Sequence, residues 1–108
     1  MERGHKVITV TIKEGEITID GHASYAPIGQ DIVCAAISAL TETFLASVRI
    51  YTTDKINSVI SAGNAVIRYK DLSADSRLLM RSFLLGVTEI AIAYPDNVKV
   101  IGASIDTP

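Results

Sequence analysis

The sequence predicts an α+β domain with the element order ββαββαβ, in which two long helices pack on one face of a mainly antiparallel sheet. Apolar residues alternate with polar ones in two pairs of short segments, and each pair is joined at a glycine. Two long segments repeat their apolar residues with the helical period, and a last alternating segment follows Pro95. The length of 108 residues fits one domain, which we expect to span residues 1–108.

The chain begins with an expected β-hairpin. Residues 6–13 alternate between apolar and polar side chains, and Glu14-Gly15 supplies a two-residue turn before a returning strand that ends at His22. A turn of this length pairs Ile12 with Ile17 and Val10 with Ile19, which places these four side chains on the core face.

The first long helix is expected over residues 32–51, where apolar residues recur in a narrow arc. Asp31 precedes the first apolar residue and is expected to be the N-cap. Cys34 then lies in the first turn, at the edge of the buried side, on one line with Ser38 and Thr41.

The second half of the chain repeats the order of hairpin and helix. Two alternating segments joined at Gly63-Asn64 predict a second hairpin, and Pro95 ends the helical segment that follows. The expected ranges are 56–62 and 65–70 for the strands, 73–94 for the helix and 98–105 for the final strand.

The second helix is apolar on nearly every side. Its large apolar residues are Leu78, Leu79, Met80, Phe83, Leu84, Leu85, Val87, Ile90 and Ile92. A helix of this kind is normally buried all round, and a small domain can cover the outer side most simply with a second copy of itself. We therefore expect a homodimer.

Composition and charge exclude several classes of protein. A net charge of −2 with scattered basic residues argues against direct binding of nucleic acid. One cysteine forms no internal disulfide, and the apolar runs are short and interrupted, so we expect no membrane span and a cytoplasmic location. One Cys and two His residues lack metal-ligand spacing, and no glycine-rich phosphate loop is present, so we expect neither a metal nor a cofactor.

The single cysteine and a nearby histidine suggest a catalytic pair. A thiol in the first turn of a helix meets free backbone N–H groups and the helix dipole, which favour the reactive thiolate. His22 precedes Cys34 by twelve residues and could accept its proton. The segment between them, residues 24–30, has no regular period, and we expect it to close over the substrate with Tyr25 as a covering side chain.

Each of these residues also has a purely structural interpretation. Cys34 could be a small core residue, and His22 a strand-end residue bonded to the backbone. N-capping fully explains Asp31, and Ser38 is either a surface hydroxyl or a group that contacts the site. Asp20, Asp31 or Ser38 could orient His22, and the sequence does not decide between them.

The segment Gly21-His22-Ala23, followed after a short loop by the stretch from Asp31 to Ser38 around Cys34, resembles the paired motifs of the Prp family of ribosomal-processing cysteine proteases. The similarity extends to the length and the ββαββαβ order, and so covers essentially the whole chain. It implies a small cytoplasmic homodimer that removes an N-terminal extension from a bacterial large-subunit ribosomal protein, the twenty-seventh of the L series. Such enzymes cut after paired aromatic residues and before an alanine-type residue.

Position by position, the resemblance implies that Cys34 is the nucleophile and His22 the general base and acid. Gly21, Asp31 and Ser38 match further positions of the motifs and are implied as supporting or substrate-binding residues. Tyr25 is added to this set from its place in the loop. We expect the backbone N–H of Cys34 or of Ala35 to stabilise the oxyanion. The alternative function is a non-catalytic, ribosome-associated module that binds a peptide and uses Cys34 only for packing.

Overall fold

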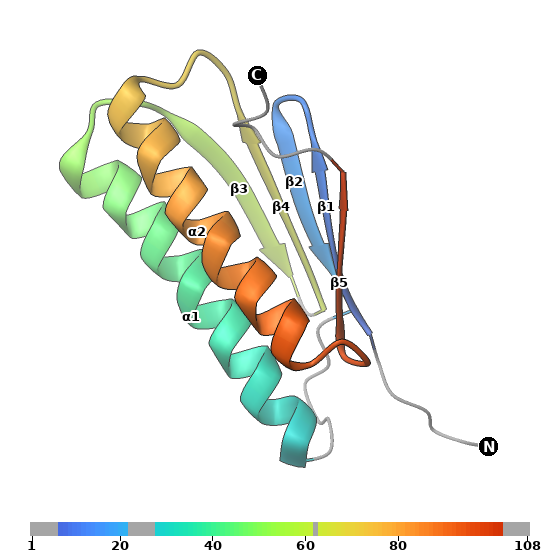
Figure 1. Ribbon diagram of the computed structural model, residues 1–108. Coiled ribbons are helices and arrows are strands. Elements are labelled where there is room, and N and C mark those ends of the chain that lie inside the picture. Colours follow the sequence, from blue (N-terminus) through green and yellow to red (C-terminus); the bar gives the residue numbers. More distant parts are fainter. Residues whose placement is uncertain (1–6, 22–27, 62, 103–108) are drawn as a thin grey trace.

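The computed structural model describes residues 7–21, 28–61 and 63–102. Its elements follow the order ββαββαβ, as the sequence predicts (Figure 1). They are β1 (Ile8–Lys13), β2 (Glu16–Asp20), α1 (Ile28–Tyr51), β3 (Ile56–Ser61), β4 (Asn64–Tyr69), α2 (Ala74–Ala93) and β5 (Val98–Gly102).

The five strands form one mixed sheet in the order β3-β4-β2-β1-β5. Neighbouring strands are antiparallel except β1 and β5, which are parallel. In the first hairpin Ile12 faces Ile17 and Val10 faces Ile19, which confirms the predicted register. The second hairpin differs from the prediction, because Asn64 pairs with Ser61 as the first residue of β4 and does not belong to the turn. Gly63, directly before it, has a φ of +80°.

Both helices lie side by side on one face of the sheet, and the core fills the space between the two layers (Figure 1). Alternate strand residues point into this core, as the period of two requires. The buried apolar residues include Ile8, Val10, Ile12, Ile17, Ile19, Ala65 and Ile67 from the sheet and Val33, Ile37, Phe44, Val48, Met80, Phe83, Leu84 and Val87 from the helices. The rings of Phe44 and Phe83 stack with centroids 5.1 Å apart, which joins α1 to α2.

Helix α1 begins at Ile28, four residues before the predicted start at residue 32. Asp31 is therefore a residue of the helix, and the expectation that it is the N-cap is wrong. Nothing after Pro27 prevents an earlier start, since Gly29 alone costs a helix only about 1 kcal/mol relative to alanine. The last three residues of the expected covering loop, 28–30, consequently belong to α1.

The part of α1 from Ile32 to Tyr51 is long and apolar enough to cross a membrane by length and composition alone. The expectation that no segment has this character is wrong. One side of this segment packs in the core through Val33, Ile37, Phe44 and Val48, and core helices of globular domains meet the same criterion.

Helix α2 has the predicted ends but a more uneven surface than expected. Ser73 is its N-cap, and its Oγ accepts a hydrogen bond from the Ser76 N–H at 3.4 Å. Its inner side is buried at Met80, Phe83, Leu84 and Val87. By contrast, Leu78, Leu85 and Ile92 are 56%, 62% and 67% exposed, so none of the described residues covers this side of the helix.

Candidate active site

The single cysteine is buried in α1, where Cys34 is 5% exposed and joins the core. We expected it at the edge of the buried face, and it lies further in. Because the helix starts at Ile28, Cys34 also lies beyond the first turn, where each backbone N–H bonds to a carbonyl one turn back. The N–H groups of Cys34 and Ala35 are thus occupied within the helix, and the expectation that they bind the oxyanion is wrong.

His22 and Tyr25 lie outside the described residues, as does the side chain of Asp31. The structure does describe Gly21, the residue directly before His22. The Gly21 N–H donates to the Gly63 carbonyl at 3.0 Å, across from the β3–β4 turn. Gly21 has a φ of +98°, and a Cβ there would lie 2.2 Å from the Val7 carbonyl oxygen. Only glycine fits at this position. The backbone directly before His22 is therefore fixed by the Val7 carbonyl on one side and by the bond to Gly63 on the other.

Asp20, which the sequence suggested could orient His22, has Asn64 as a hydrogen-bond partner. Its Oδ1 accepts a hydrogen bond from Asn64 Nδ2 at 3.3 Å, across the β2–β4 pair. This bond adds a side-chain link to the same end of the sheet as the Gly21–Gly63 contact.

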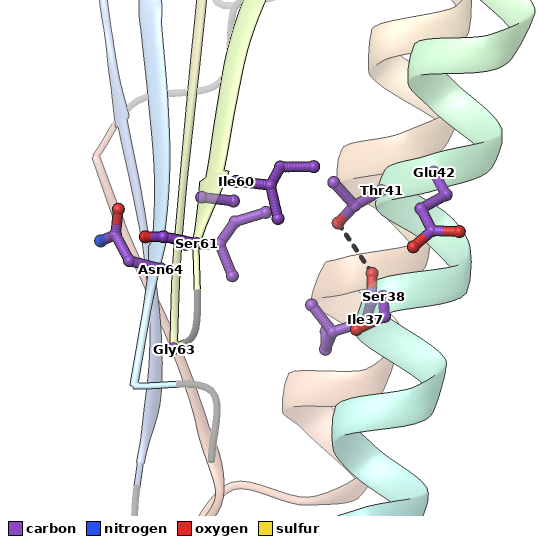
Figure 2. A pocket seen from close by; sticks show the side chains of 10 residues that line it. Ile37, Ser38, Thr41, Glu42, Ile60, Ser61, Gly63 and Asn64 are labelled. Atoms are coloured by element: carbon purple, nitrogen blue, oxygen red, sulfur yellow. Dashed lines mark hydrogen bonds between the residues drawn. The ribbon is translucent and has the colours of Figure 1, made fainter. Parts of the chain in front are cut away.

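A cavity of about 270 Å³ lies between α1 and the end of the β3–β4 hairpin. Ile37 and Thr41 of α1 lie opposite Ile60 of β3 across it (Figure 2). Ser38 and Glu42 of α1 and Ser61 of β3 also line it. The remaining lining residues are Ile19, Gly63, Asn64 and Ala65. The cavity therefore has an apolar base with a few hydroxyl, amide and carboxylate groups, which is the usual lining of a ligand site.

The cavity adjoins the predicted nucleophile along the helix. Ile37 and Ser38 follow Cys34 by three and four residues, so they lie on the same helix face one turn further on. The Thr41 hydroxyl donates to the Ile37 carbonyl at 2.7 Å, which satisfies that buried group within the helix (Figure 2). Ser38, a predicted site residue, is half-buried and lines the cavity.

Three segments of the chain are thus brought to one end of the molecule. The N-terminal half of α1 lies at the same end as the close of β2 and the β3–β4 turn (Figure 1). Gly63 links them directly, since it lines the cavity and accepts the bond from Gly21. The helical line from Cys34 to Thr41 could be found from the sequence, whereas no sequence signal indicated Ile60, Ser61 or Asn64.

Among the described residues, no group of three or more His, Cys, Asp or Glu side chains could hold a metal ion. The chemistry that these residues offer is that of a buried thiol next to a partly apolar hollow.

A family model described as cysteine protease Prp matches residues 7–99 of the chain. Two curated relatives, both named ribosomal processing cysteine protease Prp and both from strains of Staphylococcus aureus, are 31% identical over 103 residues. The match covers 87% of this chain and 97% of each relative.

Solved structures of similar proteins share the fold. The S. aureus Prp in complex with a substrate peptide is 23% identical with a TM-score of 0.75, and the match covers 87% of this chain and 95% of that one. The same protease with a covalently linked product peptide also has a TM-score of 0.75, at 22% identity, over 89% of this chain and 97% of that one. SMU.848 from Streptococcus mutans is 25% identical with a TM-score of 0.74, and the match covers 90% and 94% of the two chains.

Proposed function

Because this chain belongs to the Prp family of cysteine proteases, it hydrolyses peptide bonds, and we propose that it removes the N-terminal extension of a bacterial large-subunit ribosomal protein. The relatives that are 31% identical carry the name ribosomal processing cysteine protease, and the chain spans 97% of their length. The resemblance in the paired motifs supports the twenty-seventh protein of the L series as the substrate. The non-catalytic alternative is set aside, since the family is one of proteases.

We propose a Cys34/His22 dyad as the catalytic machinery. His22 takes the proton from Cys34 Sγ, and the thiolate attacks the scissile carbonyl carbon. The tetrahedral intermediate collapses as the C–N bond breaks, and His22 gives its proton to the leaving amine. His22 then takes a proton from water, and the hydroxide attacks the thioester carbon. The C–S bond breaks, and His22 returns the proton to the Cys34 thiolate.

The bond from the Gly21 N–H to the Gly63 carbonyl, at 3.0 Å, is the observation that carries this proposal. It ties the residue before His22 to a turn that lines the cavity next to Cys34. Gly21, directly before His22, thus lies at the same end of the fold as the part of α1 that carries Cys34, which supports the pairing of the two residues. The donors for the oxyanion then lie outside the interior of α1, because the N–H groups there bond to carbonyls of the helix itself.

The cavity between α1 and the β3–β4 hairpin is a suitable place for an aromatic side chain of the substrate. Its volume of about 270 Å³ can hold a phenyl ring, and Ile37, Ile19 and Ala65 offer apolar contact. The resemblance implies cleavage after paired aromatic residues, and we propose that one of the two occupies this cavity. Ser38 and Thr41 line the cavity and can contact the backbone or the ring edge of that aromatic residue.

The test is cleavage of a ten-residue peptide that carries two phenylalanines followed by alanine, read by mass spectrometry. We expect one cut before the alanine, and a loss of about a thousandfold or more in kcat/KM in Cys34→Ala, because the nucleophile is gone. Ser47→Ala, an equally small change further along α1, is the matched control and keeps its activity. Cleavage that persists in Cys34→Ala would refute the dyad.

We further propose that the chain acts as a cytoplasmic homodimer through α2. The exposed residues Leu78, Leu85 and Ile92 recur every seven residues and form one apolar stripe. If two α2 helices pack antiparallel about Leu85, Leu78 faces the partner's Ile92, and Arg81 faces the partner's Glu89, because each pair is equidistant from Leu85. The same symmetry therefore aligns apolar with apolar and opposite charges with each other.

A further inference from the structure

Strand β3 forms an edge of the sheet that carries none of the usual protection. Within the described residues, no strand pairs with its outer side. Natural edge strands are commonly guarded by charged residues or proline, and residues Ile56–Ser61 contain neither. The opposite edge, β5, carries the exposed Lys99. An uncharged, extended edge of this kind is suited to pairing with another chain.

The register shows which residues of β3 offer their backbone to that side. Ser61 pairs with Asn64 across the two-residue turn, and the bonded and non-bonded pairs of an antiparallel ladder alternate from there. The N–H and C=O groups of Ile56, Ser58 and Ile60 therefore point to the free edge. These three residues pair with Tyr69, Ile67 and Ala65, so their side chains lie on the helix side of the sheet.

The helix side of β3 is open along its length. The cavity next to Cys34 occupies one end, and Ile60 there is 59% exposed although it lies on the core-facing side (Figure 2). A second hollow of about 540 Å³ follows toward the other end, between Leu45 and Arg49 of α1 and Ile56 of β3. Two successive hollows thus run between the same helix and the same strand, and the first adjoins the nucleophile.

We propose that the substrate binds as an added strand on the β3 edge, with every second side chain directed into the hollows between β3 and α1. The proposal rests on the proteolytic function and deepens it. The occupant is an extended peptide segment that flanks the scissile bond. Backbone bonds to Ser58 and Ile60 hold the segment in register, and the hollow next to Cys34 receives the aromatic side chain.

A pair of variants isolates the backbone contribution. Ser58→Pro removes an N–H that points to the free edge, a position where a sheet tolerates proline, while Ser58→Ala removes the same hydroxyl and keeps the N–H. We expect the KM of Ser58→Pro for the phenylalanine peptide to exceed that of Ser58→Ala by about tenfold, with similar kcat. Equal KM values in two variants that melt like the parent protein would overturn the proposal.

A scan of N-methyl groups along the peptide tests the same backbone bonds without any change to β3. Single backbone N-methyl groups are placed along both flanks of the scissile bond, and binding to Cys34→Ala is followed by fluorescence anisotropy. We expect affinity to fall at every second residue of one flank, because only alternate N–H groups face β3. An even effect at all positions would overturn the strand geometry while leaving the proteolytic function intact.

Two further outcomes are distinct. If Ser58→Pro converts a dimer to a monomer at unchanged KM, the edge pairs with a second copy of the chain and the proposal is wrong. If the unmodified peptide is neither cleaved by the parent protein nor bound by Cys34→Ala, the proposed function fails and this inference fails with it.

Discussion

Gly21 shows how one residue can fix the backbone directly before a proposed catalytic residue, His22. Its φ of +98° belongs to a region that side chains other than glycine rarely adopt, and the Val7 carbonyl occupies the space of a Cβ. The bond from its N–H to Gly63 holds it at the cavity end of the sheet. The sequence indicated Gly21 only through a family motif, and the contacts supply the physical reason.

We expect Gly21→Ala to lower the free energy of unfolding by roughly 2 kcal/mol or more, because backbone must move to admit the methyl group. Activity should fall by about a hundredfold, since His22 follows directly and small displacements of a catalytic group are costly. Thermal melting and peptide cleavage measure the two effects.

Gly86→Ala is the control for that substitution. A Cβ at Gly86 would lie 3.0 Å from Cδ1 of Leu40, the movable end of a side chain, and alanine favours a helix by up to about 1 kcal/mol over glycine. We expect stability within about 1 kcal/mol of the parent protein and retained activity. Equal losses in the two variants would contradict the account of Gly21.

At the scale of the elements, the start of α2 is stabilised by a carboxylate from another part of the chain. Asp54 Oδ2 accepts bonds from the Ser73 N–H at 2.9 Å, from the Ser73 hydroxyl at 2.6 Å and from the Ser76 hydroxyl. These bonds, chiefly those from the two hydroxyls, hold the pKa of Asp54 below its ordinary value of 3.8. The link joins the segment after α1 to the N-cap of α2.

This link predicts a pH dependence of stability. Because the pKa of Asp54 is lower in the folded state, its contribution is complete above the ordinary value of 3.8 and is lost as the pH falls through the lowered folded value. We expect Asp54→Asn to melt at a lower temperature than the parent protein at pH 7, and this difference to shrink as the pH falls below 3.8. Melting curves across this range measure it, with the exposed Asp96→Asn as control. A difference that stays constant with pH would count against the role of the carboxylate.

At the scale of the whole molecule, the exposed apolar stripe of α2 remains to be covered. Leu85 lies at its centre, beside a hollow of about 320 Å³ lined by Leu84, Thr88 and Val100 among others. Large apolar side chains aligned in this way mark an interface more often than a solvated surface.

We expect sedimentation at micromolar concentration to give twice the chain mass of 11.6 kDa. Leu85→Glu should yield the single-chain mass, because the two-fold axis would bring two carboxylates together in an apolar seam. Ile50→Glu, at a residue that is 65% exposed on α1, serves as the control and should leave the dimer intact. A parent protein that sediments as a monomer would refute the interface.

The sequence by itself determined the elements, their order and the register of the first hairpin. These depend on local periods: two residues for a strand, 3.6 for a helix, and a short turn that pairs Ile12 with Ile17. The same local geometry aligned Cys34, Ser38 and Thr41 on one helix face. The true start of α1 was missed because Asp31 is a good cap in isolation, while the helix begins at Ile28, directly after Pro27.

Only the tertiary structure decided how the elements meet. It places β5 beside β1 in parallel and leaves β3 at the edge, and it brings Ile60 of β3 and Ser38 of α1 to the same cavity. No period in the sequence encodes a contact between segments some twenty residues apart, because such contacts depend on how all the apolar faces are buried at once. Cys34 could thus be singled out from the chain as the candidate nucleophile, whereas the cavity one helical turn away could not.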